Sequence, residues 1–557
     1  MKKSIIKITA IALSMLFLLS ACGKTTQGPA TTDAGANNSQ SPASPANPSS
    51  PANPSSPAGT PGVGANTGNA ALSDEMLTIV LESEPSSLFP TYSSDVTLTE
   101  EIFNSCMYDV FLFQNLNTGE VEPRIATSWE WIDDYRIRLN IRDDVYAYGG
   151  NRITAYDIAE ASAYCVENGF NVTNYSMMDK DKIYAEDDTT LVLGTLDIYP
   201  SLPDLFTSNF FLPIISMKAL EDVGGWDAAI RNPNINSGRY FFEEWVDGQY
   251  IKLVRNDDYW DQDSLPYYKY LRFVFAPDPT ARAMAVQSGD ADYAIRLTGT
   301  QVEALSGVNS VAIEVVPANV AYSFYMNTSR APFDDVNFRK AIQLLIDYEG
   351  VIEVGANGLA DPVPTCFSIA NPYFLRNYTG FPDRVDVDKA KELIAQTSYN
   401  GEKLFISTEP SFALAMEYVQ ACLIAGGINV ELSVLEPASY RTEMGSGEYD
   451  MNVVPAANTN IARVLNRLDG RVSTEVSSGG SQYQNDEFFK LIDIGRYSKD
   501  DSERRQALYA VQQHVIDNAV MIGLYNSTAL GAHRSDIVSD YYFYEGIPYF
   551  WSTRPIS

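Results

Sequence analysis

The chain has 557 residues, 45% of them hydrophobic and 20% charged, so it is a globular protein with material for about three domains. Acidic residues outnumber basic residues by 71 to 39, which gives a formal net charge of −32. A surface of this sign repels a phosphate backbone, and we therefore expect no nucleic-acid partner.

The N-terminus has the features of a secretion signal. Lysines near the start precede an apolar run at 8–19 that is too short for a comfortable membrane span. The next residues, LSAC, resemble the lipobox of bacterial lipoproteins, which implies removal of residues 1–21 and a diacylglycerol on Cys22. We therefore expect a lipid anchor on the extracytoplasmic face of the cell membrane, at the cell surface or in the periplasm. The alternative is a secreted protein with an idle thiol.

Residues 22–72 are rich in Pro, Ser, Ala, Asn and Gly and repeat the sequence PANPSSPANPSS. Such a segment cannot bury enough apolar surface to offset the entropy of ordering, so we predict a disordered tether. Its prolines favour extended polyproline II backbone, which makes the tether semi-rigid.

The stretch 321–347 predicts a connection between two lobes. Tyr322, Phe324 and Met326 alternate with smaller or polar residues, which indicates a strand. Ala331-Pro332 ends that strand, because proline lacks a backbone donor and keeps the preceding residue extended. A helix with one apolar face follows. A strand that stops at a proline and enters a helix is typical of a crossover.

This stretch resembles the MNTxxxPFxDxxxRxAxxxxID signature of the family 5 extracellular solute-binding proteins. That family contains the peptide-, dipeptide- and nickel-binding subunits of ABC importers. Similar patches recur from about Leu77 to the end of the chain. The matching positions in the signature are Met326, Asn327, Thr328, Pro332, Phe333, Asp335, Arg339, Ala341, Ile346 and Asp347.

The resemblance implies an α/β fold like that of the type II periplasmic binding proteins, with two lobes and an extra subdomain. Two crossover strands, near Tyr325 and near Leu524, would form the hinge. The predicted parts are lobe I at 73–95, 217–325 and 524–557, an extra subdomain packed on lobe I at 96–216, and lobe II at 326–523.

Several local predictions follow from spacing and from the family pattern. Thr154 and Asp157 have the spacing of a helix capping box. Arg239 stands where the family usually has proline, which we interpret as a loop variation that leaves the fold unchanged. Residues 412–425 predict a helix, whose expected inward-facing residues are Leu414, Tyr418, Ala421 and Cys422.

The sequence contains no pattern that supports catalysis. It has no Gly-x-Ser-x-Gly, no HExxH and no phosphate-binding glycine loop. His514 and His533 are the only histidines and are poorly placed to form a nucleophile–base set. We therefore predict that the protein is not an enzyme and that it has no catalytic residue, cofactor or metal site.

The cysteines other than Cys22 lack the CxxC spacing of a zinc site. We expect Cys165 on the buried face of a helix. A disulfide between Cys106 and Cys165, or between Cys366 and Cys422, can form outside the cytoplasm. Sequence spacing does not decide whether either pair is bonded.

Candidate ligand contacts lie beside the crossover. Tyr322 and Phe324 would line a cleft between the lobes, where small ligands are usually enclosed. Glu84 belongs to a loop that resembles the family's ExxxLxP loop at the ligand cleft, which makes its carboxylate a further candidate. A solvated loop carboxylate is the alternative for Glu84.

One departure from the family concerns the amino end of a peptide. Oligopeptide binders have a Trp- and Asp-containing segment after the motif YDM, and that aspartate binds the α-ammonium. This chain has Asn458, Thr459 and Asn460 in the segment instead, and neither the Trp nor the Asp. Either another acid such as Glu84 takes the role, or the ligand has no free amine and these three residues offer neutral hydrogen bonds. A third reading is that the loop contacts nothing.

We therefore predict a membrane-anchored solute-binding subunit of an ABC importer, with a monomeric body that captures a peptide or peptide-like solute between two closing lobes. Its partners would be an ABC permease, its ATPase, and the membrane through Cys22. The alternatives are a ligand sensor, a binder of a sugar, opine or metal chelate with the same fold, or a hydrolase.

Overall fold

The computed structural model divides the chain into two units, Met1–Pro61 and Gly62–Ser557, and all the described residues belong to the second. The predicted signal peptide, Cys22 and all but the last residue of the predicted tether lie outside the described residues. In the described part of the chain, no helix combines the length and apolar character needed to cross a bilayer. The structure describes residues 72–90, 98–114, 121–170, 175–208, 211–457, 461–472, 479–539, 543–544 and 547–556.

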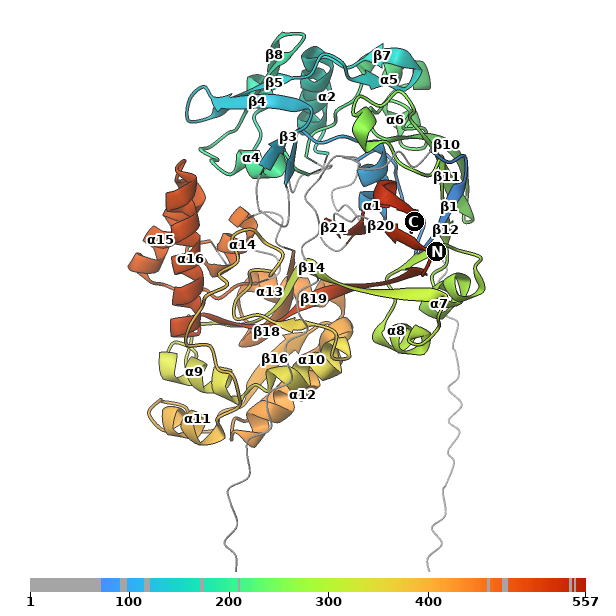
Figure 1. The fold of residues 1–557 in the computed structure, drawn as a ribbon. Coiled ribbons are helices and arrows are strands. Elements are labelled where there is room, and N and C mark those ends of the chain that lie inside the picture. The colour runs from blue at the N-terminus through green and yellow to red at the C-terminus, as the bar shows by residue number, and fades with distance from the viewer. Residues whose placement is uncertain are drawn as a thin grey trace, which may run out of the picture. The chain divides into compact units, whose positions relative to one another are not determined.

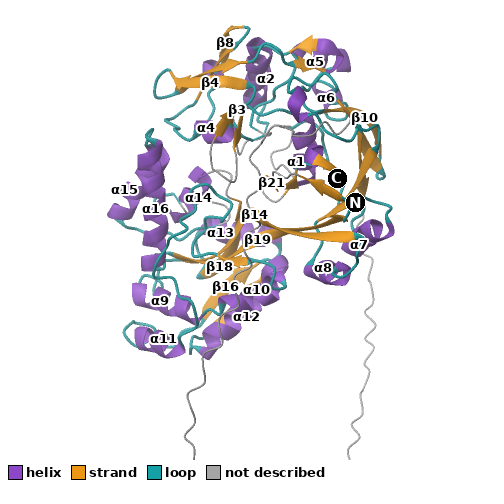
Figure 2. Cartoon of the chain, viewed as in Figure 1, coloured by secondary structure: helices purple, strands orange, loops and turns teal. Residues whose placement is uncertain are grey.

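The second unit contains a mixed sheet of 11 strands (Figures 1 and 2). A short strand, β15 (Asp361–Pro362), pairs with β19. The other strands lie in the order β10 (Tyr240–Val246), β11 (Tyr250–Arg255), β12 (Tyr270–Phe275), β1 (Met76–Leu81), β13 (Tyr293–Ile295), β19 (Met521–Arg534), β14 (Val311–Met326), β18 (Met451–Ala457), β16 (Leu404–Thr408) and β17 (Val430–Val434).

We call β10, β11, β12, β1 and β13 the β1 half of the sheet, and β18, β16 and β17 the β16 half. β1 is parallel to both of its neighbours, and β16 is parallel to β17 and β18. β14 and β19 are antiparallel to each other and join the two halves. Each half therefore has the parallel strands of an α/β unit, connected by two long strands that run through both.

A second sheet of four strands belongs to the part before β10. Helix α2 (Ala155–Glu167) contacts two of its strands. One hydrophobic core includes residues of this sheet, of α1 (Leu98–Met107) and of the β1 half. A smaller core packs α7 (Pro279–Ser288) and α8 (Gly299–Leu305) against the β1 half. The strands of the second sheet lie in the order β4 (Ala126–Trp131), β5 (Arg136–Ile141), β9 (Thr190–Gly194) and β8 (Tyr184–Asp187).

Helices cover both faces of the β16 half. Phe324 and Met326 of β14 enter the core on one face, whereas Ala321 and Tyr325 enter the core on the other. The alternation predicted for this strand is confirmed, because neighbouring side chains of a strand point to opposite faces. The helices of the first face are α9 (Val336–Leu345), α10 (Tyr348–Ala356), α11 (Val387–Ile394) and α12 (Ala413–Ala425), and those of the second are α14 (Ile461–Leu468), α15 (Asp486–Tyr497) and α16 (Asp501–Asn518).

The remaining elements are short and connect the parts described above. The capping box predicted at the start of α2 is present, since Thr154 and Asp157 exchange side-chain-to-backbone hydrogen bonds. The short elements are β2 (Leu112–Gln114), β3 (Val121–Pro123), β6 (Tyr146–Ala147), β7 (Asn151–Arg152), α4 (Leu202–Leu205), α5 (Met217–Val223), α6 (Trp226–Ala229), α13 (Pro437–Ser446), β20 (Ile537–Ser539), β21 (Phe543–Tyr544), β22 (Ile547–Pro548) and β23 (Thr553–Pro555).

The two crossing strands β14 and β19 pair irregularly at two places. Their register shifts between Tyr322 and Ser323 and, over a longer gap, between Pro317 and Ala321. There the buried side chain of Asn526 donates a hydrogen bond of 2.8 Å to the carbonyl oxygen of Ala318. A side chain thus replaces part of the backbone ladder at this gap, and we expect the two strands to bend more easily there.

The part before β10 also contacts the β16 half through polar side chains. Tyr373 donates a hydrogen bond of 3.3 Å to Asp204 of α4, and Arg504 of α16 lies 3.6 Å from the same carboxylate. Burial raises the pKa of Asp204, although the charge of Arg504 opposes that rise. The predicted extra subdomain is therefore in contact with both halves.

The prediction for the helix after Phe412 was wrong about its buried face. Leu414 is 67% exposed and Ala421 is also exposed, whereas Met416, Val419 and Leu423 are completely buried. The physical reason is that α12 is apolar on all sides, so the spacing of apolar residues does not select one face.

Arg239 is more than a loop variation. Its buried guanidinium lies 3.9 Å from the ring centre of Trp551 and 4.8 Å from that of Tyr259, and it donates a 3.0 Å hydrogen bond to Ser264 Oγ. These contacts attach the C-terminal segment to the β1 half through cation–π attraction and packing.

The two disulfides left open by the sequence are both absent from the structure. Neither Cys106 and Cys165 nor Cys366 and Cys422 are joined by a disulfide in the described part of the chain, and Cys165 is completely buried as predicted. Burial raises the pKa of the Cys106 thiol to about 12 and that of Cys366 to about 11, so both remain protonated and unreactive at neutral pH.

Candidate functional site

The residues that match the family signature hold the β16 half together. Arg339 is 3% exposed and donates hydrogen bonds of 2.8 Å to the carbonyl oxygen of Phe333 and 2.9 Å to that of Asn518. It also reaches the carbonyl oxygen of Ala519 at 3.1 Å. The guanidinium therefore ties the turn before α9 to the C-terminal end of α16, where unpaired carbonyls need donors.

Asn327 and Thr328 have a similar structural role. The Asn327 amide donates to the carbonyl oxygens of Gly447 at 2.9 Å and Tyr449 at 3.0 Å, and the Thr328 hydroxyl donates to Ser481 at 3.0 Å. These bonds fix the end of β14 against the segments around α13 and α15. The signature identifies the framework of the site rather than its lining.

Three aromatic side chains meet around Tyr322 of β14, one of the two strands that both halves of the sheet share. Tyr322 stacks on Tyr525, its register partner on β19, with ring centres 4.6 Å apart and planes at 15°. Phe412 meets the edge of Tyr322 at 5.5 Å. We call Tyr322, Tyr525 and Phe412 the aromatic cluster. Tyr322 and Phe412 are half-buried, whereas Tyr525 is buried.

The cluster lies next to the carboxyl ends of parallel strands. Phe412 ends the short helical turn Pro410–Phe412 that comes after β16, and open α/β sheets bind ligands beyond such strand ends. Burial raises the pKa of Tyr322, and the charge of Arg296 only opposes that rise, so the phenol stays neutral at physiological pH. The cluster can therefore offer aromatic faces and a neutral hydroxyl to a ligand.

Phe324, the second aromatic residue predicted to line the site, is 0% exposed and lies in the core against α9, α10 and α12. A ring with no exposed surface cannot touch a ligand directly in this structure. Tyr322 lies two residues earlier in the strand and on the same face, so the buried Phe324 ring packs the core next to it.

Glu84 is bound to residues of the β1 half. Its carboxylate accepts a hydrogen bond from the indole of Trp245 and two from the backbone N–H of Gly248, each 3.2 Å long. These bonds use the carboxylate to anchor the loop after β1 to the β10–β11 turn. Its predicted contact with a ligand amine stays a prediction, and such a contact would compete with these bonds.

The other predicted ligand contacts, Asn458, Thr459 and Asn460, lie outside the described residues. The structure does show what flanks them, because β18 ends at Ala457 and α14 begins at Ile461. Sequence reasoning missed Tyr525 and Phe412, which the structure adds to Tyr322. An aromatic residue on the second crossing strand was the signal that could have indicated Tyr525.

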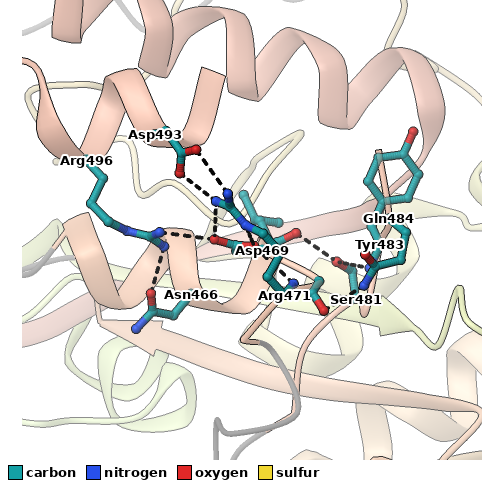
Figure 3. Close-up of polar contacts among 10 residues, drawn as sticks. Asn466, Asp469, Arg471, Ser481, Tyr483, Gln484, Asp493 and Arg496 are labelled. Atoms are coloured by element: carbon teal, nitrogen blue, oxygen red, sulfur yellow. Dashed lines mark hydrogen bonds and ion pairs between the residues drawn. The ribbon is translucent and has the colours of Figure 1, made fainter. Parts of the chain in front are cut away.

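A buried carboxylate fixes α14 in place (Figure 3). Asp469 is 1% exposed on its side chain and pairs with Arg471 at 2.8 Å and Arg496 at 3.1 Å. Arg471 also pairs with Asp493 of α15 at 2.6 Å, and Arg496 donates a 2.8 Å bond to Asn466. Figure 3 shows both guanidinium groups directed at Asp469. The network joins the C-terminal end of α14 to the C-terminal part of α15.

We expect Asp469→Asn to lower the free energy of unfolding by about 1.5 kcal/mol at pH 7, because a buried charged hydrogen-bond acceptor is lost. Burial raises the pKa of Asp469, but the bonds from Arg471 and Arg496 lower it more, so the net pKa lies below its usual value. The contribution is present above the unfolded-state pKa and disappears as the pH falls through the folded-state value. Urea unfolding at pH 7 and pH 3 measures it.

Asp493→Asn is the matched control, since Asp493 shares Arg471 but is 42% exposed. Exposed ion pairs contribute little, so this variant should stay within about 0.5 kcal/mol of wild type. Equal losses in both variants would contradict the special role of the buried carboxylate.

A second titrating pair lies on the two crossing strands. His533 Nε2 of β19 is 3.2 Å from Glu314 Oε1 of β14, and the ring stacks on Tyr293. Burial lowers the pKa of His533, but the hydrogen bond and charge of Glu314 raise it more, so the net pKa lies above its usual value.

A raised histidine pKa contributes stability below the unfolded-state value, and that stability is lost as the pH rises through the folded-state value. We expect His533→Gln to be about 1 kcal/mol less stable than wild type at pH 6, with a smaller difference at pH 9. Urea midpoints at the two pH values test this. A difference that grows with pH would contradict the ion pair.

The described residues contain no group of three or more His, Cys, Asp or Glu side chains arranged to hold a metal ion. The geometry instead combines a hinge-like pair of strands with an aromatic cluster, which suits non-covalent binding.

Comparisons with known proteins agree with this geometry. The model of the bacterial extracellular solute-binding proteins, family 5 Middle, matches residues 120–468. The probable D,D-dipeptide-binding periplasmic protein DdpA of Escherichia coli (strain K12) is 24% identical over 475 residues, which cover 82% of this chain and 89% of that protein. The oligopeptide-binding protein OppA of Bacillus subtilis (strain 168) is 23% identical, covering 81% of this chain and 87% of OppA.

Solved structures show the same fold. The ABC transporter substrate-binding protein CtaP from Listeria monocytogenes superposes with a TM-score of 0.74 at 20% identity, covering 86% of this chain and 99% of CtaP. The unliganded open form of the murein tripeptide-binding protein MppA gives a TM-score of 0.76 at 18% identity, covering 87% of this chain and 98% of MppA.

The mixed sheet, its two crossing strands and these likenesses define the fold of the periplasmic binding proteins, which confirms the predicted fold class. The chain belongs to the bacterial extracellular solute-binding proteins of family 5. Members of this family are substrate-binding proteins of ABC importers rather than enzymes.

Proposed function

We propose that this chain captures a peptide or peptide-like solute outside the cytoplasm and delivers it to an ABC permease with its ATPase, without chemical turnover. The observation that carries the proposal is the aromatic cluster on the crossing strands, beside the carboxyl ends of parallel strands. The relatives named for D,D-dipeptide and oligopeptide binding support the solute class.

Capture requires that the two halves move toward each other. In this proposal lobe I consists of residues 73–95, 217–325 and 524–557, the extra subdomain of 96–216, and lobe II of 326–523. The gap in strand pairing between Pro317 and Ala321 supports bending at that point. A ligand favours the closed state only by the contacts that it gains there, so residues of both lobes must touch it.

The membrane anchor is a further part of the proposal. Cys22 would carry a diacylglycerol, and residues 22–72 would connect a monomeric body to the extracytoplasmic face of the membrane. Radiolabelled palmitate should enter the wild-type chain and not the Cys22→Ser variant in the native host. Label in both chains would contradict lipidation at Cys22.

Mass spectrometry of co-purified ligand tests the proposed solute. The full-length chain is purified in mild detergent, unfolded in guanidinium chloride, and the released small molecules are sequenced. We expect peptides of a few residues from the wild type and far less from the Tyr322→Ala variant. Release of a non-peptide compound in stoichiometric amount would contradict the peptide proposal.

A further inference from the structure

Two charged residues lie at the carboxyl ends of the parallel strands of the β1 half. Glu82 follows β1 and Arg296 follows β13, and the two side chains form an ion pair. Neither is buried, since the Arg296 side chain is 46% exposed and that of Glu82 is 35% exposed. The pair therefore lies at the edge where open α/β sheets bind ligands.

The backbone of Arg296 is held in an uncommon conformation. Its φ of 52° lies in the left-handed region, which a non-glycine residue rarely adopts. Arg282, which is 3% exposed, donates to the carbonyl oxygens of Ile295 at 3.1 Å and of Arg296 itself at 2.6 Å. A further bond of 2.7 Å to Ala276 completes the brace. The buried Arg282 therefore holds the backbone of Arg296 in place.

The chain next to Arg296 is also bonded to β19, the strand that carries Tyr525 of the aromatic cluster. Leu297 continues from Arg296 with a backbone bond of 3.0 Å to Leu530 on β19, which ties this point to the crossing strand. The charge of Arg296 lowers the pKa of the Tyr322 phenol, against the rise that burial causes, so the guanidinium lies within electrostatic reach of the aromatic cluster. Backbone strain that is held in place by buried groups is found most often at functional sites.

We propose that Arg296 is a ligand-binding residue that takes a carboxylate group of the solute, after the guanidinium exchanges its bond with Glu82 for one with the ligand. The inference rests on the proposed capture of a peptide and assigns the α-carboxylate of that peptide to Arg296. A guanidinium suits this role because it binds a carboxylate through two parallel N–H donors.

The arrangement at Glu84 is consistent with recognition through the acid end. Its carboxylate is bonded to Trp245 and Gly248, so holding a ligand ammonium would require breaking those bonds. An exposed ion pair of purely structural purpose would contribute little to stability and would need neither the left-handed backbone nor the buried brace.

The test uses random tripeptide-to-pentapeptide libraries, synthesised as free acids and as C-terminal amides. Each library is incubated with full-length wild type, Arg296→Gln, Glu82→Gln and the control Arg330→Gln, and retained peptides are counted by mass spectrometry. Arg330 is a suitable control because it is also exposed, at 47%, and paired with an aspartate, Asp450.

We expect wild type and Arg330→Gln to retain acids at least ten-fold better than amides, and Arg296→Gln to lose this preference. Glu82→Gln should retain acids better than wild type, since the competing carboxylate is gone, whereas a structural ion pair would make both variants weaker. Arg296→Lys should restore part of the preference and excludes a folding defect as the cause.

The outcomes separate the two proposals. Equal retention of acids and amides by wild type, or an unchanged preference in Arg296→Gln, overturns the assignment of Arg296 and leaves peptide capture in place. Retention of neither library by wild type contradicts peptide capture, and the assignment with it.

Discussion

Replacing Arg339 with alanine should lower the free energy of unfolding by about 4 kcal/mol, because several buried carbonyl oxygens lose their donor at once. The carbonyls belong to Phe333, in the turn before α9, and to Asn518 and Ala519, at the end of α16. The Arg339 side chain joins these two segments. The measurement is urea unfolding followed by circular dichroism.

A further measurement can show which part of the protein loses stability in Arg339→Ala. All six tryptophans lie outside residues 326–523, so tryptophan fluorescence reports on the β1 half and the part before β10. Hydrogen exchange of amides in 326–523 should accelerate in Arg339→Ala while fluorescence changes less. Arg330→Ala, nine residues earlier and exposed, should stay within about 0.5 kcal/mol of wild type. A loss below about 1 kcal/mol for Arg339→Ala would contradict the role of this guanidinium in joining the two segments.

Replacing Tyr322 with alanine should weaken binding of the co-purifying ligand about 30-fold, equivalent to about 2 kcal/mol, through the loss of an aromatic face. The empty protein should lose about 1 kcal/mol of stability, because the ring also stacks on Tyr525 and contacts Phe412. Isothermal titration calorimetry and thermal unfolding give the two values.

Tyr322→Phe separates the ring from the hydroxyl and should bind within about three-fold of wild type if the aromatic face dominates. Tyr146→Ala removes an exposed tyrosine on β6 and should change neither quantity. Full affinity in Tyr322→Ala would remove this residue from the site.

Much of the fold follows from patterns that act locally. Alternation along β14 predicted the two faces of the sheet, and capping-box spacing predicted the start of α2, because each depends on a few neighbouring residues. The signature around Arg339 indicated the family because its side chains make bonds that the framework requires. Local pattern did not predict the buried face of the helix after Phe412. That helix has apolar residues on every face, so tertiary packing decides which of them are buried.

The candidate site was predictable only in part. Tyr322 could be placed because it belongs to the strand that crosses the sheet, but burial of Phe324 depends on helices far away in sequence. The partners of Glu84 come from a turn more than 150 residues later, with separations of 161 and 164 positions. Arg239 likewise needed the C-terminal Trp551 before its role was visible.

Side chains of β14 enter two hydrophobic cores in alternation, and this has a consequence for protein engineering. A one-residue insertion before Tyr322 would move Phe324 and Met326 to the face now occupied by Ala321 and Tyr325, and would disrupt both cores together. Fusion of a fluorescent reporter into this strand is therefore excluded. The exposed turn at Gly401, where an added Cβ would meet nothing within 4 Å, is the better point of entry for a foreign domain.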